Sequence, residues 1–154
     1  MKKIILIAFL FLSIKNVSAQ ELTWYNDINL AMSAANKEHK PILMFFTGSD
    51  WCVWCHRLQD EVFKQPDFIK WAKDSVILME VDFPRQNNLP AQIQNQNNHL
   101  KQEFGITGFP IVWFVNASKK DSDIVYDKIG STGYLAGGPS VWIKAAKDIL
   151  MKKK

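Results

Sequence analysis

The sequence predicts an α/β fold in which helices flank both faces of a central mixed β-sheet. Apolar runs of strand length, such as Ile42–Thr47 and Val76–Phe83, alternate along the chain with segments of helical periodicity. The run Ile42–Thr47 is continuous, which is typical of a strand that is covered on both faces. With 154 residues, the chain is long enough for one domain with its own core and short for two.

The first 19 residues predict a secretory signal peptide. Lys2-Lys3 forms a positive start, Ile4–Leu12 is a short apolar run, and Val17-Ser18-Ala19 places small side chains before a cut at Gln20. The apolar run is short for a bilayer span, and an uncleaved anchor is the alternative. We therefore expect one domain over residues 20–154 in a periplasmic or secreted protein, a setting in which disulfides persist.

The charge of the chain does not indicate a nucleic-acid partner. The formal net charge is +4, but residues 1–19 contain three lysines and no acid, so the chain without them carries +1. Three further lysines form the tail Lys152–Lys154. Because no basic face remains, we expect protein partners and no nucleic acid. We also expect the chain to act as a monomer.

Helices and strands alternate through the N-terminal half. Pro41 ends a first amphipathic helix and Gln65-Pro66 interrupts the second, because proline lacks the N–H that a helix interior requires. The predicted elements are helix Leu22–Lys40, strand Ile42–Thr47, turn Gly48–Asp50, the helix that carries the cysteines and runs to Phe63, and helix Pro66–Lys73.

The C-terminal half predicts an antiparallel pair of strands and a last helix. Pro84–Asn98 is rich in Gln and Asn and has little periodicity, so we expect a surface loop or a poorly formed helix there, tolerated rather than functional. The predicted elements are strand Val76–Phe83, helix Leu100–Phe104, strand Ile111–Val115, turn Asn116–Asp123, strand Ile124–Ile129, the glycine-rich loop Ser131–Gly138 and helix Ser140–Met151, which Pro139 opens.

The only two cysteines, Cys52 and Cys55, are separated by two residues. They follow the buried strand and stand at the start of a helix, an arrangement typical of a redox site. Unpaired N–H groups and the helix dipole at this end favour a thiolate over a thiol. We therefore expect Cys52 to be the nucleophile, and Cys55, one turn further in, to attack the mixed disulfide and release the product.

Two other chemistries compete for the cysteines. Cys55-His56 completes a C-x-x-C-H pattern, which attaches c-type haem, although a haem needs an open pocket and a further ligand. Zinc needs four ligands, and only His39, His56 and His99 could supplement the two cysteines. We expect neither a metal nor another cofactor.

Glu80 interrupts the apolar run Val76–Phe83. A carboxylate in a central strand must be paired or functional, because burying an unpaired charge is costly. In one interpretation Glu80 lies at an edge or has a partner. In the other, it accepts the proton of the buried cysteine.

Two segments resemble the thioredoxin superfamily. Trp51-Cys52-Val53-Trp54-Cys55, preceded by Lys40–Phe46, is similar to its active-site segment, and Gly105–Pro110 is similar to the loop that ends in a cis-proline opposite the cysteines. Gly137-Gly138-Pro139 resembles a secreted bacterial subgroup close to the C-terminal domain of DsbD-type thiol:disulfide interchange proteins. The resemblance covers Leu22 to Leu150 and implies a thioredoxin fold.

The resemblance implies roles for individual residues. Cys52 corresponds to the attacking thiol, Cys55 to the resolving thiol, and Pro110 to the cis-proline, whose missing N–H leaves room for the substrate backbone. The substrate would contact Pro110 together with Phe109, and Trp51 and Trp54 would form an apolar rim.

The chain departs from the family pattern in two places. Many thioredoxins carry a buried acid six residues before the first cysteine, and this position is Phe46, which makes Glu80 the first candidate for the proton acceptor of Cys55. The inner pair Val53-Trp54 differs from the Gly-Pro of thioredoxin, so the redox potential does not carry over.

These observations predict an exported thiol–disulfide oxidoreductase that reduces or isomerises protein disulfides and is supplied with electrons by a membrane-bound donor. The alternative on the same fold is a non-catalytic binding module that holds its partner with the rim of Trp51 and Trp54. The presence of both thiols speaks against that alternative.

Overall fold

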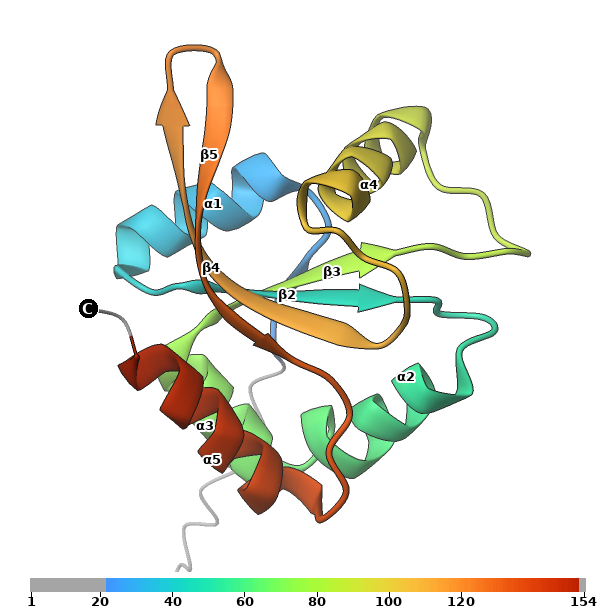
Figure 1. The fold of residues 1–154 in the computed structure, drawn as a ribbon, viewed down its shortest axis with the longest axis vertical. Helices are drawn as coiled ribbons and strands as arrows, with labels where there is room; N and C mark the ends of the chain where they lie inside the picture. Colours follow the sequence, from blue (N-terminus) through green and yellow to red (C-terminus); the bar gives the residue numbers. More distant parts are fainter. Residues whose placement is uncertain (1–21, 153–154) are drawn as a thin grey trace, which may run out of the picture.

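The computed structural model describes residues 22–152 as one mixed sheet between two layers of helices (Figure 1). The sheet has five strands in the order β1-β3-β2-β4-β5; β1, β3 and β2 are parallel, and β4 and β5 are antiparallel to their neighbours. The α/β prediction is therefore confirmed. The elements are β1 (Trp24–Tyr25), α1 (Ile28–Glu38), β2 (Ile42–Thr47), α2 (Val53–Leu58), the π-helix η1 (Gln59–Phe63), α3 (Pro66–Ser75), β3 (Ile77–Asp82), α4 (Ala91–Glu103), β4 (Ile111–Lys120), β5 (Asp123–Thr132) and α5 (Gly138–Met151).

Strand β2 separates two hydrophobic cores, and all six of its residues are buried. Leu43 and Phe45 point to the face covered by α2, η1, α3 and α5, where the cysteines also lie. Met44 and Phe46 point to the opposite face, under α1 and α4. We call these the cysteine-side core and the opposite core. Their alternation follows from the two-residue period of a strand.

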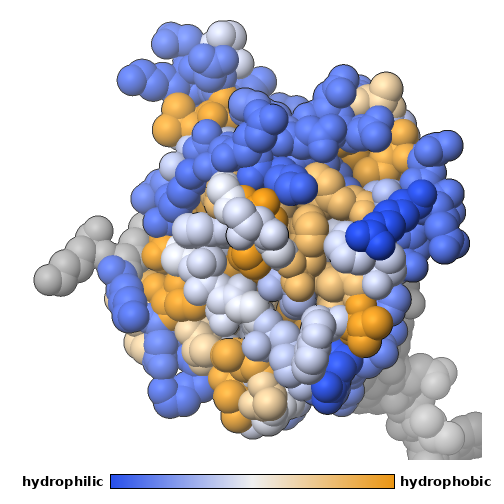
Figure 2. Space-filling model, turned by 45° about the vertical axis from the view of Figure 1, so that its right-hand side comes forward, coloured by the Kyte–Doolittle hydropathy of each residue, from blue (hydrophilic) through white to orange (hydrophobic). Residues whose placement is uncertain are grey.

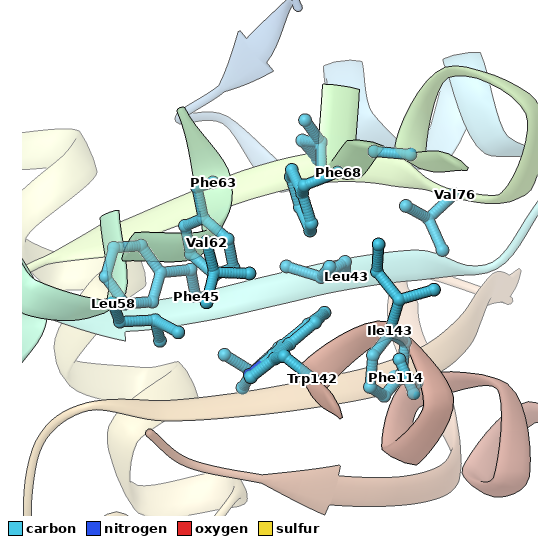
Figure 3. Packing of buried hydrophobic residues seen from close by; sticks show 14 of the residues in the cluster. Leu43, Phe45, Leu58, Val62, Phe63, Phe68, Val76, Phe114, Trp142 and Ile143 are labelled. Atoms are coloured by element: carbon cyan, nitrogen blue, oxygen red, sulfur yellow. The ribbon is translucent and has the colours of Figure 1, made fainter. Parts of the chain in front are cut away.

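The cysteine-side core is built around Trp142 of α5 (Figure 3). Its ring is fully buried and meets the rings of Phe63, Phe68 and Phe114 from three different elements, at centroid distances of 5.4, 5.6 and 6.2 Å. The indole N–H donates to the carbonyl oxygen of Gly133 at 3.0 Å. Trp142 thereby joins the core to the loop between β5 and α5.

The expected helix Leu22–Lys40 is shorter than predicted. Trp24 and Tyr25 instead form β1, which pairs with Leu78 and Met79 of β3. The helix begins only after Asp27, whose carboxylate accepts the backbone N–H groups of Asn29 and Leu30 as an N-cap. Two residues of edge strand are too few to produce a period that distinguishes them from a helix start.

Of the two interpretations of Pro84–Asn98, the loop is correct only up to Pro90, and a helix follows: α4 spans Ala91–Glu103 and is longer and better formed than predicted. Gln96 accepts the Ile28 N–H and donates to the Asn26 carbonyl oxygen, each at 2.9 Å. Asn97 is buried and donates to the carbonyl oxygen of Asp82 at 2.9 Å. The amide side chains thus make tertiary hydrogen bonds, which a search for apolar periodicity does not detect.

The predicted turn Asn116–Asp123 is mostly strand. Strand β4 continues to Lys120, β5 starts at Asp123, and Asp121 in the tight turn between them has a φ of 56°. The resulting hairpin rises beyond the rest of the sheet (Figure 1). The last helix begins at Gly138, with Pro139 in its first turn as expected.

The predicted signal peptide, residues 1–19, and the cut at Gln20 lie outside the described residues. Within residues 22–152, no helix combines the length and the apolar character that crossing a membrane requires.

Asn97→Ala should lower the free energy of unfolding by about 1–3 kcal/mol, because it leaves the Asp82 carbonyl oxygen without its donor. The neighbouring Asn98 is exposed on the same helix, so Asn98→Ala is the matched control for helix propensity. Urea denaturation of both variants measures the difference. Equal stabilities would contradict the assigned role of Asn97 and favour a dispensable insert.

Candidate functional site

The two cysteines lie where β2 ends and α2 begins. Cys52 is the N-cap of α2, and Cys55 lies in its first turn. The two are joined by a disulfide, with their Cα atoms 5.2 Å apart. Helix α2 passes directly into η1, so the cysteines start a continuous helical segment that ends at Phe63.

Cys52 and Cys55 differ in exposure and in hydrogen bonding. Cys52 is 6% exposed, whereas Cys55 is 0% exposed. The backbone N–H of Cys55 donates to the Cys52 sulfur at 3.2 Å as well as to the Cys52 carbonyl oxygen at 3.0 Å. A donor aimed at this sulfur would stabilise a thiolate once the disulfide is reduced. The Cys52 sulfur therefore receives a backbone donor and is slightly exposed, whereas Cys55 is fully buried.

A polar network holds the turn that precedes Cys52. The Asp82 carboxylate, at the end of β3, accepts the backbone N–H of Ser49 at 2.8 Å and its hydroxyl at 2.5 Å. A ring nitrogen of His56, Nε2, lies 2.7 Å from the Ser49 carbonyl oxygen, to which the N–H tautomer donates. Two strands and the helix thus meet at Ser49.

Asp50 ties the same turn to the loop after β3. Its carboxylate accepts the backbone N–H groups of Arg85, at 2.9 Å, and Gln86, at 2.7 Å. These hydrogen bonds lower the pKa of Asp50 below its ordinary value. The Arg85 guanidinium lies over the Trp51 ring, 4.0 Å from its centroid. The loop therefore covers one side of the tryptophan before the cysteine pair.

Trp51 packs closely against the turn and the cis-proline loop. Its indole N–H donates to the Phe83 carbonyl oxygen at 2.8 Å, and a Cβ at Gly48 would overlap its ring. Its ring also meets that of Phe109 edge-on at 5.6 Å. The Phe109–Pro110 peptide bond is cis. Trp51 consequently has a packing role in this turn.

Pro110 reaches the site through the strand register. Ile111, the first residue of β4, pairs with Phe46 near the end of β2. Pro110 therefore lies just before the start of β4, at the same end of the sheet at which β2 ends and the cysteine turn begins. Trp51 and Phe109 pack against the core that contains the cysteines, and Pro110 follows Phe109 directly.

Trp54 has a different aromatic neighbour from that of Trp51. Its side chain is 51% exposed and that of neighbouring Val53 is 69% exposed. The Trp54 ring contacts Tyr134, from the loop after β5, at a centroid distance of 5.2 Å. Figure 2 shows this side of the molecule, with hydrophilic surface over α4 above and more apolar surface over α2 and the loop after β5 below. Tyr134 is not among the residues predicted for the site, and its only signal in the sequence is its place in the glycine-rich loop.

Glu80 lies on the cysteine-bearing face of the sheet. It is two residues from Leu78 of the cysteine-side core and pairs in register with Phe45 of the same core. Burial raises the pKa of Glu80 above its ordinary value, and the Asp82 carboxylate raises it further. Phe46, by contrast, points into the opposite core, so Phe45 is the β2 residue that faces the cysteines. No β2 side chain therefore supplies an acid there.

The groups needed for the haem and zinc alternatives have other partners. The cysteine sulfurs are bonded to each other, and His56 is directed to the Ser49 carbonyl oxygen. In the part of the chain that is described, no three His, Cys, Asp or Glu side chains lie close enough to share a metal ion.

Residues 28–130 match the family described as the thioredoxin-like domain. The chain belongs to this thioredoxin-like family. Over 134 residues it is 33% identical to the protein named "Disulfide bond reductase DsbH" of Chlamydia pneumoniae, covering 87% of this chain and 76% of that protein. A solved structure named "DsbH Oxidoreductase" has a TM-score of 0.75 and 30% identity, covering 89% of this chain and 90% of that chain.

The thioredoxin-like fold extends to more distant structures. The oxidised C-terminal domain of DsbD from Neisseria meningitidis has a TM-score of 0.51 and 18% identity, covering 82% of this chain and 98% of that chain. With the Cys52–Cys55 disulfide at the start of α2, the family membership makes this thioredoxin-like chain a thiol–disulfide oxidoreductase.

Proposed function

We propose that the protein reduces disulfides in other proteins, with Cys52 as the attacking thiol and Cys55 as the resolving thiol. The observation that carries these roles is the asymmetry of the pair: the Cys55 N–H is directed at the Cys52 sulfur, and Cys55 itself is fully buried. The direction of electron flow is supported by the relative that is named a disulfide bond reductase.

The reaction consists of two thiol–disulfide exchanges. The Cys52 thiolate attacks one sulfur of the substrate disulfide, the substrate S–S bond breaks, and the other substrate sulfur leaves as a thiolate. Cys55 then loses its proton and attacks the Cys52 sulfur of the mixed disulfide. This forms the Cys52–Cys55 disulfide and releases the second substrate thiol. Two electrons pass to the substrate, and an external dithiol must reduce the enzyme before the next turnover.

The substrate polypeptide would lie between the two groups of side chains beside the pair. Trp51, Phe109 and Pro110 would contact it on one side and Trp54 on the other. Pro110 offers its carbonyl oxygen but no N–H, so a substrate backbone can approach without an unpaired donor. The binding-module alternative uses the same surface without exchange.

Glu80 is the proposed acceptor of the Cys55 proton. It lies on the cysteine-bearing face, in register with Phe45 and two residues from Leu78, and its raised pKa brings it closer to that of a thiol. A general base works best when its pKa lies near the working pH.

The proposed setting is the periplasm or the exterior of the cell. Removal of residues 1–19 would leave the thioredoxin-like domain, 20–154, as a monomer that a membrane-bound donor reduces. The positive start, the apolar run and the small residues before Gln20 support this proposal.

Mass analysis of exported protein should therefore give a chain that begins at Gln20. The reason is that small side chains at positions 17 and 19 suit the signal peptidase. An exported chain that still begins at Met1 would contradict cleavage and favour an anchor.

Substituting the cysteines separates enzyme from binding module. In an insulin-reduction assay with dithiothreitol, Cys52→Ser should lose all activity above the dithiothreitol background. Cys55→Ser should attack and then stall, so that a mixed disulfide with the substrate accumulates and is visible by mass. Accumulation in Cys52→Ser instead would reverse the roles. Undiminished binding without reduction by the unsubstituted protein would favour the module.

Glu80→Gln should change how stability depends on pH. Because the folded protein raises the pKa of Glu80, the folded state holds this proton more tightly than the unfolded chain does. The stability that the proton contributes is complete below the unfolded pKa of about 4.3 and is lost as the pH rises through the folded pKa. Urea denaturation across this window should therefore show a smaller fall for Glu80→Gln than for the unsubstituted protein.

The same variant tests proton transfer. Glu80→Gln should form the mixed disulfide at the normal rate but resolve it more slowly, which rapid quenching and alkylation can follow. Asp67→Asn, at an exposed position of α3, is the control. Resolution at the normal rate in Glu80→Gln would exclude Glu80 as the acceptor.

A further inference from the structure

Four side chains from three segments form one stack beside the cysteine pair. The Arg57 guanidinium lies 5.0 Å from the centroid of the Trp54 ring and 5.3 Å from that of Tyr134. The two rings contact each other at 5.2 Å. Glu61 of η1 accepts from Arg57 Nε at 2.9 Å and from the Tyr134 hydroxyl at 2.5 Å. Each ring therefore has a defined neighbour although the stack is at the surface.

Glu61 joins the stack by using both carboxylate oxygens. Oε1 accepts from Arg57 and Oε2 from Tyr134. The hydrogen bond from Tyr134 and then that from Arg57 lower the pKa of Glu61, so the carboxylate stays charged at neutral pH. The charge of Arg57 is thus compensated inside the stack, and the exposed faces of the two rings carry no unbalanced charge.

The stack lies where a substrate would pass. Trp54 is between the two cysteines in the chain, and its side chain is half exposed. Tyr134 follows Gly133, whose carbonyl oxygen accepts the Trp142 indole N–H. Gly133 also lies close to the cis-proline, because a Cβ added there would be 3.2 Å from the Pro110 carbonyl oxygen. The loop of Tyr134 therefore runs from the cis-proline to Trp54.

We propose that Trp54, Arg57 and Tyr134 form a rigid platform for an apolar side chain next to the disulfide of the substrate polypeptide, with Glu61 as the residue that positions it. This inference rests on the proposed reductase function and adds a substrate class to it. Aromatic faces favour apolar and aromatic partners. The exposed Val53 beside Trp54 extends the apolar surface. Because Glu61 already pairs with Arg57, an acidic side chain of the substrate would gain little from the Arg57 charge.

The test uses homodimeric disulfides of the peptide Gly-X-Cys-X-Gly, with X as Phe, Leu, Asp or Lys. Reduced protein is mixed with increasing concentrations of peptide, and samples are quenched, alkylated and analysed by mass spectrometry. The rate of protein oxidation at each concentration gives a maximal rate and a half-saturating peptide concentration. Bis(2-hydroxyethyl) disulfide, which has no side chain for the platform, reports the chemistry alone. We expect the Phe and Leu peptides to half-saturate the protein at a concentration about three- to tenfold lower than the Asp and Lys peptides.

Glu61→Ala should remove this preference, so that the half-saturating concentrations of the Phe and Asp peptides become equal. The matched control is Asp60→Ala, which breaks the Asp60–Lys64 ion pair at the same i,i+4 spacing but away from the aromatic rings. Tyr134→Phe keeps the ring but loses its hydrogen bond to Glu61, so its peptide preference should lie between those of Glu61→Ala and Asp60→Ala. The indole N–H resonance of Trp54, assigned with Trp54→Phe, should shift in Glu61→Ala and stay in place in Asp60→Ala.

Three results would overturn the platform. These are a peptide preference that Glu61→Ala retains, a preference for the Asp peptide, and a Trp54 resonance that Glu61→Ala leaves in place. Failure of the underlying function gives a different result, because the unsubstituted protein would then be oxidised by neither the peptides nor the small disulfide.

Discussion

The burial of β2 is the constraint on which the rest of the structure depends. Its six residues have no access to solvent, so helices must cover both faces of the sheet. The chain then leaves the strand by the turn that begins at Gly48. That turn ends at Cys52 and starts α2. The cysteine pair is therefore positioned by the most buried element of the fold, and the exchange reaction takes place just beyond the C-terminal end of β2.

The turn itself is held by charged and polar groups from the adjacent strand. Asp82 takes both the N–H and the hydroxyl of Ser49, and Asp50 takes two backbone N–H groups from the loop after β3. Such carboxylate-centred bonds are directional and strong compared with neutral ones. They define where Cys52 lies without using the hydrophobic core, which leaves the core free to bury Cys55.

The two sides of the site have different physical character. Trp51 is packed under Arg85 and against Phe109, so that side is closed and rigid. Trp54 is half exposed and is supported from beneath by a guanidinium and a tyrosine. A substrate would thus meet a tightly packed tryptophan, Trp51, and a half-exposed one, Trp54. This division is consistent with a protein that must bind loosely enough to release its product.

The sequence alone determined the layer architecture, the redox pair and the last helix. Ile42–Thr47 was predicted with its observed bounds, because a fully buried strand is a continuous apolar run. The C-x-x-C spacing after a buried strand indicated a redox pair at a helix start. The resemblance of Trp51–Cys55 and Gly105–Pro110 to the thioredoxin superfamily then favoured thiol–disulfide exchange over haem or zinc binding.

Only the tertiary structure decided what polar residues do. Asn97 and Gln96 belong to a helix that is fixed in part by hydrogen bonds to distant backbone groups, so their segment was predicted only as a surface loop or a poorly formed helix. The neighbours of Trp54 come from η1 and from the loop after β5, and no spacing in the sequence brings Tyr134 to Glu61. Apolar burial leaves a periodic trace in the chain, whereas a hydrogen bond between distant segments leaves none.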